Sequence, residues 1–459
     1  MSDPSALQAL FYPRSVAVVG ASKKRTKIGY EITKNLRRFS GTVYAVTTSK
    51  GQVDGLPTYP SVADIPGDVD LAVLAIPAPQ VAGVLEECGK KGVRAAVIIS
   101  AGFSEAGNAE GERQLTALAA RYDMALVGPN TVGIANTDVD LNATFLVQPT
   151  KGGIAFLTQS GALGAAVMYK TVYEDIGFSK FASLGNMAGA TFGDLLDYLA
   201  EDEQTTSIAL YIEGVQDGRA FLKAARACSK RKPVIALKSG SSQAGKRAAT
   251  SHTGSLAGDD AIYDAAFRQA GIIRARTIDD MLDMAKAFSQ PHPRGGSVAI
   301  LTNAGGPGIL AADACEHEGL TVAPLAEETK EALRGVLPPF ASVTNPIDTI
   351  AQAGYEEYAA CMRILQKDPH IDAILAVIVV PTFTRIGYST HAQALLDSWK
   401  RKKTLVTCFM SGEVTNTSVE LMKLNGIPAY PSPERAARAL GALHTYERWY
   451  HEHHDSNTD

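Results

Sequence analysis

The sequence has little of what would mark a membrane, secreted or nucleic-acid-binding protein. Its charge is nearly balanced, with 44 Lys and Arg against 48 Asp and Glu, for a formal net charge of −4. Aromatic residues make up only 7% of the chain and basic residues do not gather into long runs, which argues against nucleic acid as the main partner. The longest apolar runs, such as residues 373–381, are too short to cross a bilayer, so no membrane association is expected.

Cysteine is also scarce. The five cysteines are odd in number, widely separated and in no CxxC pair, which argues against a disulfide framework or a zinc site. The N-terminal MSDPSALQALFYPRS has no basic region followed by a long apolar core, unlike a secretory signal. We therefore expect a soluble cytoplasmic α/β protein with reduced thiols and no metal site.

What the sequence does contain is a series of short β-branched runs, each ending in a glycine-rich or small-residue turn. At 459 residues the chain has room for about three domains of roughly 150 residues. We place a first domain at 1–140, a second at 150–290 and a third at 296–450, with 451–459 a frayed tail. A fortuitous metal site formed by the tail's three histidines is the alternative for that last segment.

The first domain opens with the strand Ser15–Val19, the turn Gly20-Ala21-Ser22 and a helix that begins near Gly29. Strand, glycine turn and helix form the first unit of a nucleotide-binding fold, with the helix N-terminus free to receive phosphate. A nicotinamide site would need GxGxxG here and an acidic residue after the second strand. The sequence instead has Lys50 after that strand, which favours a ligand with an extra phosphate.

Further predicted strands of this domain end in small or turn-forming residues, where an open parallel sheet binds ligands. Any one of these strand ends can be an ordinary loop, but five of them at one edge of the sheet indicate a ligand-binding site. These ends are Ile76-Pro77, Gly102-Phe103 and Gly128-Pro129-Asn130, besides the Gly20 and Lys50 turns.

The second domain holds the most reactive stretch, in which His252 stands among small residues after Lys246-Arg247. Hydroxyl and backbone N–H groups of such a loop can hold phosphate oxygens. Predicted strands place Ser160, Gly185 and Glu213 at the same sheet edge. Glu213 is a candidate to hydrogen-bond one nitrogen of His252 and leave the other as the nucleophile. A solvated loop carboxylate is the alternative interpretation of Glu213, and a loop-closing role is the alternative for His252.

An internal repeat links the second and third domains. Residues 155–164 align without a gap with 299–308, and Thr158, Gly161 and Gly164 match Thr302, Gly305 and Gly308. This offset of 144 residues predicts two related βα domains. The third domain's glycine-rich turn at 305–308 could grip an anion, but Pro307 lacks a donor and packing against another subunit is an equal alternative.

Together these residues resemble the alpha subunit of the nucleoside-diphosphate-forming acyl-CoA synthetases, most closely the ADP-forming acetate-CoA ligase type. The first two domains are also similar to the alpha subunit of succinate-CoA ligase. The resemblance implies a Rossmann-like CoA-binding domain followed by two flavodoxin-like, doubly wound domains of the succinyl-CoA synthetase type. The implied CoA-binding residues are Gly20, Ala21, Ser22, Gly29, Lys50, Ile76, Pro77, Gly102, Phe103 and Asn130.

The resemblance further implies that His252 is phosphorylated in turnover and that Glu213 orients it. It implies phosphate binding by Ser160, Gly161, Gly185, Asn186, Thr253 and Gly254. The family's reaction is acyl-CoA, phosphate and ADP giving carboxylic acid, CoA and ATP, reversibly, through an acyl phosphate.

The chain departs from succinate-CoA ligase at Ala248-Ala249 and in carrying a third domain, which favours the acetate type. It has no further 200 or so residues for an ATP-grasp module. We therefore expect ADP or ATP with Mg²⁺ on a separate ATP-grasp beta subunit, in an α₂β₂ heterotetramer. A CoA-binding or acyl-CoA-sensing protein without turnover, a succinate-CoA ligase-type subunit and a nicotinamide oxidoreductase remain the alternatives.

Overall fold

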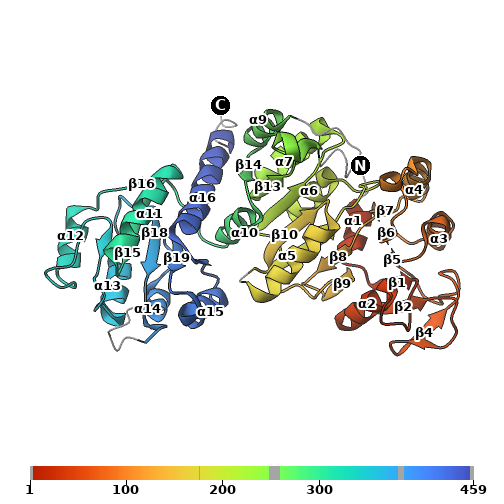
Figure 1. The fold of residues 1–459 in the computed structure, drawn as a ribbon, viewed down its shortest axis with the longest axis horizontal. Helices are drawn as coiled ribbons and strands as arrows, with labels where there is room; N and C mark the ends of the chain where they lie inside the picture. The colour runs from red at the N-terminus through yellow and green to blue at the C-terminus, as the bar shows by residue number, and fades with distance from the viewer. Residues whose placement is uncertain (1–3, 175, 248–258, 381–386, 455–459) are drawn as a thin grey trace. The chain divides into compact units, whose positions relative to one another are not determined.

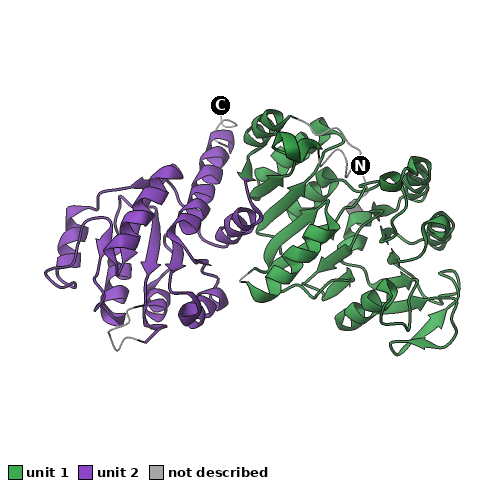
Figure 2. Cartoon of the chain, viewed as in Figure 1, with its two compact units in different colours: residues 1–274 green, residues 275–459 purple. Residues whose placement is uncertain are grey.

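The computed structural model describes residues 4–174, 176–247, 259–380 and 387–454. The chain forms two compact units, residues 1–274 and 275–459, which are coloured separately in Figure 2. Unit 1 contains two sheets and unit 2 contains one, and helices flank the strands of each (Figure 1). No helix among the described residues is both long enough and apolar enough to span a bilayer.

The first sheet has the order β3-β4-β2-β1-β5-β6-β7. The chain moves from β1 to β2 on one side and from β5 to β7 on the other, so the topological switch point lies between β1 and β5. The strands are β1 (Ser15–Val19), β2 (Thr42–Val46), β3 (Gln52–Val53), β4 (Leu56–Tyr59), β5 (Leu71–Leu74), β6 (Ala95–Ile98) and β7 (Ala125–Val127), and the helices are α1 (Pro4–Phe11), α2 (Ile28–Asn35), α3 (Ala78–Lys91) and α4 (Ala109–Arg121).

The second sheet has the order β14-β13-β12-β10-β11-β8-β9. Its switch point lies between β10 and β12. The strands are β8 (Gly133–Asn136), β9 (Leu141–Thr144), β10 (Lys151–Thr158), β11 (Phe178–Ser183), β12 (Ser207–Ile212), β13 (Val234–Lys238) and β14 (Ile272–Ala275), and the helices are α5 (Gly161–Tyr173), α6 (Phe192–Glu201), α7 (Gly218–Ser229) and α9 (Asp260–Ala270).

The chain passes from the first sheet to the second earlier than the sequence suggested. The β8–β9 hairpin falls across our boundary at residue 140, yet β8 pairs antiparallel with β11, with Ala135 opposite Phe181. The hairpin therefore belongs to the second sheet. All residues of its two strands are buried, which ties the two sheets into one unit with a shared hydrophobic core.

Unit 2 contains a sheet of order β16-β15-β18-β19-β20, with β17 paired to β15. Its switch point lies between β15 and β18. The strands are β15 (Ser297–Thr302), β16 (Thr321–Val322), β17 (Ile347–Asp348), β18 (Ala373–Ile378), β19 (Thr404–Phe409) and β20 (Ala429–Tyr430), and the helices are α10 (Ile278–Ala287), α11 (Gly305–His317), α12 (Glu327–Arg334), α13 (Tyr355–Leu365), α14 (Thr390–Ser398), α15 (Asn416–Leu424) and α16 (Pro433–His454).

The internal repeat of the sequence is also a repeat of structure. In the β10 turn, Thr158 Oγ1 donates to Ser160 O and accepts from Ser160 N, and in the β15 turn Thr302 Oγ1 bonds Ala304 in the same way. A Cβ on Gly164 would lie 3.1 Å from the Thr158 methyl, and one on Gly308 would lie 3.0 Å from the Thr302 methyl. Both glycines allow the helix to begin against the end of its strand, which is why they recur.

The C-terminal histidines correct one prediction. We expected a frayed tail from residue 451, but α16 continues to His454. The His453 ring stacks on Trp449 at 4.5 Å between centroids, and the His454 ring stacks on Tyr450 at 3.9 Å. These contacts one turn apart extend the helix. Within the described part of the chain, no three His, Cys, Asp or Glu side chains are grouped to hold a metal ion.

Candidate active site

The first glycine turn is built by close backbone contact. Gly20 has φ +94°, and a Cβ there would lie 2.3 Å from Ala75 O at the end of β5. A Cβ on Gly29 would lie 2.0 Å from Gly20 O, so the start of α2 rests directly on the turn. Lys27, the residue before α2, makes no side-chain cap, which leaves the first N–H groups of α2 open to an anion.

Two lysines meet at the edge of this turn. Lys23 Nζ donates to Lys50 O at 3.2 Å, which brings the loop after β1 to the loop after β2. Both loops are exposed. Lys50 was predicted for its position after the second strand. Lys23 was not singled out, although the basic run Lys23-Lys24-Arg25 was the available signal.

The other predicted CoA residues of the first sheet lie along the same edge. Ser100 Oγ donates to Ile76 O at 2.5 Å, and Pro77 directly precedes α3. Ser22 Oγ accepts from Lys24 N at 3.1 Å, while Ala21 is buried. The predicted residue Phe103 is also buried, so its ring packs in the hydrophobic core and only its backbone faces the turn.

Asn130 and Asn186 join the first sheet to the second. Asn130 Nδ2 donates to Asn186 Oδ1 at 3.2 Å, and Asn186 N donates to Pro129 O at 3.0 Å. Gly185 has φ +54°, and a Cβ there would lie 2.2 Å from Pro129 O. The predicted CoA and phosphate residues at this point are therefore neighbours.

Glu105 is a member of this cluster that sequence reasoning did not assign to the site. Its carboxylate accepts from Gly102 N and from Asn186 Nδ2, each at 2.5 Å. Partial burial favours the neutral acid, but these hydrogen bonds outweigh it and hold the pKa of Glu105 below its usual value. The carboxylate therefore stays ionised and fixes the Gly102 turn against the second sheet.

The switch point of the second sheet is organised by Gln159. Its Oε1 accepts from Glu213 N at 2.5 Å and from Gly214 N at 3.0 Å, and its Nε2 donates to Gly214 O at 3.0 Å. Gln159 thus fixes the loop that carries Glu213. Gln159 directly precedes the predicted residue Ser160, but its role is visible only in the structure.

Ser160 begins α5 beside that loop. Its Oγ accepts from Leu163 N at 3.3 Å and caps the helix, whose first residue is Gly161. A Cβ on Gly161 would lie 2.8 Å from Val132 Cγ1, so α5 starts against the segment that follows Asn130. The structure therefore brings Ser160, Gly161 and Glu213 together at one switch point, as predicted from their positions after strands.

His252, Thr253 and Gly254 lie outside the described residues, so their roles stay predictions. The residues on either side of the stretch meet, since Lys246 Nζ lies 3.5 Å from the Asp259 carboxylate. Lys246 follows β13 and Asp259 precedes α9. The chain therefore leaves and returns at the carboxyl end of β13, beside the Glu213 loop that follows β12.

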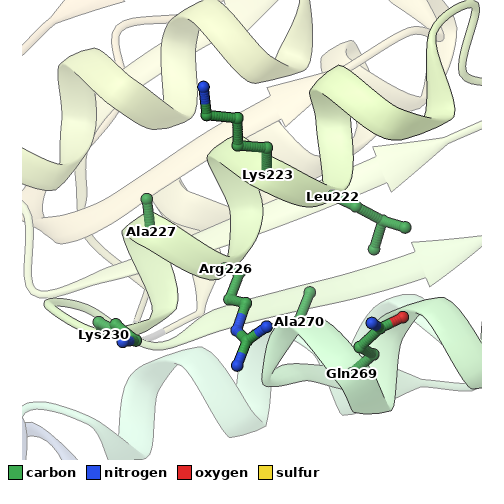
Figure 3. A pocket seen from close by; sticks show the side chains of 7 residues that line it. All are labelled: Leu222, Lys223, Arg226, Ala227, Lys230, Gln269 and Ala270. Carbon is green, nitrogen blue, oxygen red and sulfur yellow. The ribbon is translucent and has the colours of Figure 1, made fainter. Parts of the chain in front are cut away.

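Cavities in unit 1 lie at both ends of the second sheet. One of about 480 Å³ is lined by Lys223 and Arg226 of α7, by Lys230 directly after that helix, and by Gln269 and Ala270 of α9 (Figure 3). Arg226 and Lys230 stand at the C-terminal end of α7, where positive charge complements the helix dipole, whereas the Glu213 loop precedes the N-terminal end of this helix. A second cavity of about 250 Å³ opens at the carboxyl edge between Met187 and Val215.

The five cysteines take no part in this site. All are buried and unpaired, and burial raises the pKa of each thiol to about 12. A thiol with so high a pKa supplies almost no thiolate at neutral pH.

Three family models together match most of the chain. A CoA binding domain matches residues 14–137, a succinyl-CoA ligase like flavodoxin domain matches 151–288, and a ligase-CoA domain matches 298–453. They bear out the predicted fold, a Rossmann-like CoA-binding domain and two flavodoxin-like domains.

Similar proteins span the whole length of the chain. The acetate–CoA ligase [ADP-forming] II subunit alpha of Pyrococcus furiosus is 50% identical over 95% of this chain and 97% of its own. The acetate–CoA ligase [ADP-forming] I of Archaeoglobus fulgidus is 44% identical over 96% of this chain, which matches 64% of that longer protein. A solved structure of the dinucleotide forming acetyl-coenzyme A synthetase 1 of Ca. Korarchaeum cryptofilum, in complex with phosphate and ADP, matches all of both chains, with a TM-score of 0.94 and 38% identity.

Proposed function

The chain belongs to the alpha subunits of the ADP-forming acetate–CoA ligases, and from this premise we propose that it relays a phosphoryl group through His252. The overall reaction is acyl-CoA, phosphate and ADP giving carboxylic acid, CoA and ATP. The observation that carries the proposal is the switch point of the second sheet, where Gln159 fixes the Glu213 loop beside the start of α5.

The proposed reaction has three steps. A phosphate oxygen attacks the acyl carbonyl, the C–S bond breaks, and the thiol leaves with a proton, which gives an acyl phosphate and CoA. A His252 nitrogen then attacks phosphorus and the carboxylate leaves. Finally the terminal phosphate oxygen of ADP attacks the phosphohistidine, the P–N bond breaks, and the imidazole is restored with ATP formed. The role of Glu213 is to hold the other ring nitrogen of His252.

The first sheet fits the CoA expected of its domain. The uncapped N-terminus of α2 and the close approach of Gly20 and Gly29 leave room and N–H groups for a pyrophosphate. Lys23 and Lys50 supply positive charge for the additional phosphate that distinguishes CoA from its dephospho form. The Asn130–Asn186 hydrogen bond connects this sheet to the second sheet, which holds the proposed phosphoryl site.

We propose a separate ATP-grasp beta subunit as the partner, with ADP or ATP and Mg²⁺ bound there, in a cytoplasmic α₂β₂ heterotetramer. Membership among proteins named as alpha subunits supports a separate partner. In this arrangement His252 carries the phosphoryl group between a CoA site on this chain and a nucleotide site on the other.

The test is intact-mass and peptide-mass analysis of the complex of this chain with its beta subunit. The complex is incubated with acetyl-CoA and phosphate, or with ATP and Mg²⁺, and kept alkaline because phosphohistidine is acid-labile. We expect one phosphoryl group on the His252 peptide. His252→Asn keeps CoA binding but gains no phosphate, because the amide cannot carry it.

Glu213→Gln is the matched test of the orienting carboxylate. We expect phosphorylation to slow by about 10²-fold or more, as for loss of a positioned acid–base group. The control is Asp217→Asn, four residues along the same loop, because Asp217 caps α7 through Arg219 N and Ala220 N and asparagine keeps that cap. An unphosphorylated wild-type complex that still binds CoA would instead support an acyl-CoA-sensing protein without turnover.

A further inference from the structure

Lys238 is a buried lysine at the same edge that the mechanism so far leaves unused. It is the last residue of β13 and pairs in register with Ile212, the residue before Glu213. Only 5% of Lys238 is exposed. The side chain therefore carries an amine into the interior directly beside the loop that holds the proposed orienting carboxylate.

The contacts of this amine come from the loop that follows β13 and from α9. Lys238 Nζ donates to Ser239 O and lies 4.9 Å from the centre of the Tyr263 ring in α9. A carbonyl oxygen and an aromatic face both stabilise a cation, but neither neutralises it.

The described residues place no carboxylate within ion-pair distance of Lys238 Nζ. Asp260 and Glu213 act on it only as nearby charges, and Asp260 is itself paired with Arg274 at 2.5 Å. Burial lowers the pKa of Lys238, while the attraction of Asp260 and Glu213 works in the opposite direction.

Lys180, a second deeply buried lysine among the described residues of unit 1, has a structural role and provides a comparison. Lys180, which is fully buried, forms a direct ion pair of 2.9 Å with Asp202. Burying an ammonium without such a partner is costly. We therefore expect a negatively charged group to bind near Lys238, at the carboxyl edge of the second sheet, during turnover.

We propose that Lys238 is a positioning residue for phosphoryl transfer, whose buried ammonium offsets the charge of the phosphate or phosphoryl group bound beside Glu213. This inference rests on the proposed function. A phosphate dianion and the Glu213 carboxylate repel each other when brought together, and one fixed cation near both reduces that repulsion. Lys238 acts through this charge and through the Ser239 and Tyr263 contacts that order the surrounding loops.

The test measures the KM for inorganic phosphate and the KM for acetyl-CoA with the complete complex in the ATP-forming direction. Lys238→Met keeps the apolar stem and removes the charge. We expect it to raise the KM for phosphate by about tenfold or more, since a charge-assisted contact is worth at least a factor of ten. The KM for acetyl-CoA should stay within about twofold, and Lys238→Arg should restore part of the phosphate affinity.

The matched control is Lys232→Met. Lys232 precedes the same strand at its opposite end, is half-buried, and donates to Asp202 O. Its removal costs stability without removing charge from the carboxyl edge, so we expect both KM values to stay unchanged. If Lys238→Met reduces the yield of folded protein, Lys238→Gln, which keeps a donor for Ser239 O, provides the same measurement.

Equal changes in both KM values, or no change in either, would show that Lys238 only fills the space beneath Tyr263 and would overturn the inference. A phosphate effect of the same size in Lys232→Met would also overturn it. The proposed function is judged separately, by the phosphoryl group on wild-type His252. A phosphorylated wild type with an unaffected Lys238→Met removes the role of Lys238 and leaves the relay intact.

Discussion

At the scale of single residues, the site depends on side chains that hold loops as much as on those that react. Gln159 makes three hydrogen bonds to the Glu213–Gly214 loop, and Glu105 fixes the Gly102 turn to Asn186. Neither is proposed to exchange a proton or a phosphoryl group. Gln159 fixes the loop after β12 to the end of β10, and Glu105 fixes the turn after β6 to the loop after β11.

Lys50→Glu tests the residue that we expect to bind the additional phosphate of CoA. We expect CoA affinity to fall about 10- to 100-fold, the effect of losing one charge-assisted contact, while dephospho-CoA affinity changes much less. Isothermal titration with both ligands measures the difference. The control is Lys90→Glu at the far end of α3, where Lys90 pairs only with Glu86. Equal losses for the two ligands would contradict this role of Lys50.

At the scale of elements, the Gly20 turn and α2 fit together only without a side chain. A Cβ on Gly29 would lie 2.0 Å from Gly20 O, a backbone atom that cannot swing away. We expect Gly29→Ala to destabilise unit 1 by about 1–3 kcal/mol, the usual cost of overpacking, and to weaken CoA binding through the displaced helix N-terminus.

Gly83→Ala is the control for that change. Gly83 lies exposed within α3, and a Cβ there meets no atom within 4 Å. The substitution should stabilise the protein by about 0.5–1 kcal/mol, because alanine favours a helix more than glycine does. Denaturant unfolding of both variants measures the difference, and a Gly29→Ala variant as stable as the wild type would contradict the packing argument.

At the scale of the whole molecule, a buried polar cluster ties the first two sheets into one unit. Lys180 Nζ contacts Asp202 at 2.9 Å and Tyr12 Oη at 3.2 Å, and lies 5.0 Å from the centre of the Tyr12 ring. Tyr12 follows α1, whereas Lys180 lies in β11 and Asp202 follows α6. This cluster joins the N-terminal segment to the second sheet.

Lys180→Met should destabilise unit 1 by about 3–5 kcal/mol, because it leaves Asp202 buried without its cation. We expect calorimetry to show two transitions, one for each compact unit, with only the transition of unit 1 moved to lower temperature. The surface variant Lys151→Met, which removes an exposed partner of Asp138, should move neither transition by much. A single transition, or an equal shift of both, would show that the two units do not unfold independently.

The sequence by itself determined the strands, their glycine turns and the repeat. β1 has the predicted ends, Ser15 and Val19, because an apolar β-branched run and a following turn are local signals. The repeat was equally readable, since each glycine must match the threonine six residues before it. The order of residues along the edge of a doubly wound sheet then follows from topology, which is why Ser160 and Glu213 could be placed together.

Only the tertiary structure decided which distant side chains meet. The β8–β9 hairpin joins the second sheet, Asn130 reaches Asn186, Lys23 reaches Lys50, and Lys238 is buried beneath Tyr263. None of these has a periodic or local signal, because each depends on segments that are far apart in the chain and are brought together by packing. Burial also decides how a lysine behaves chemically. The sequence does not show whether a lysine will be buried, or whether a carboxylate will lie beside it in the fold.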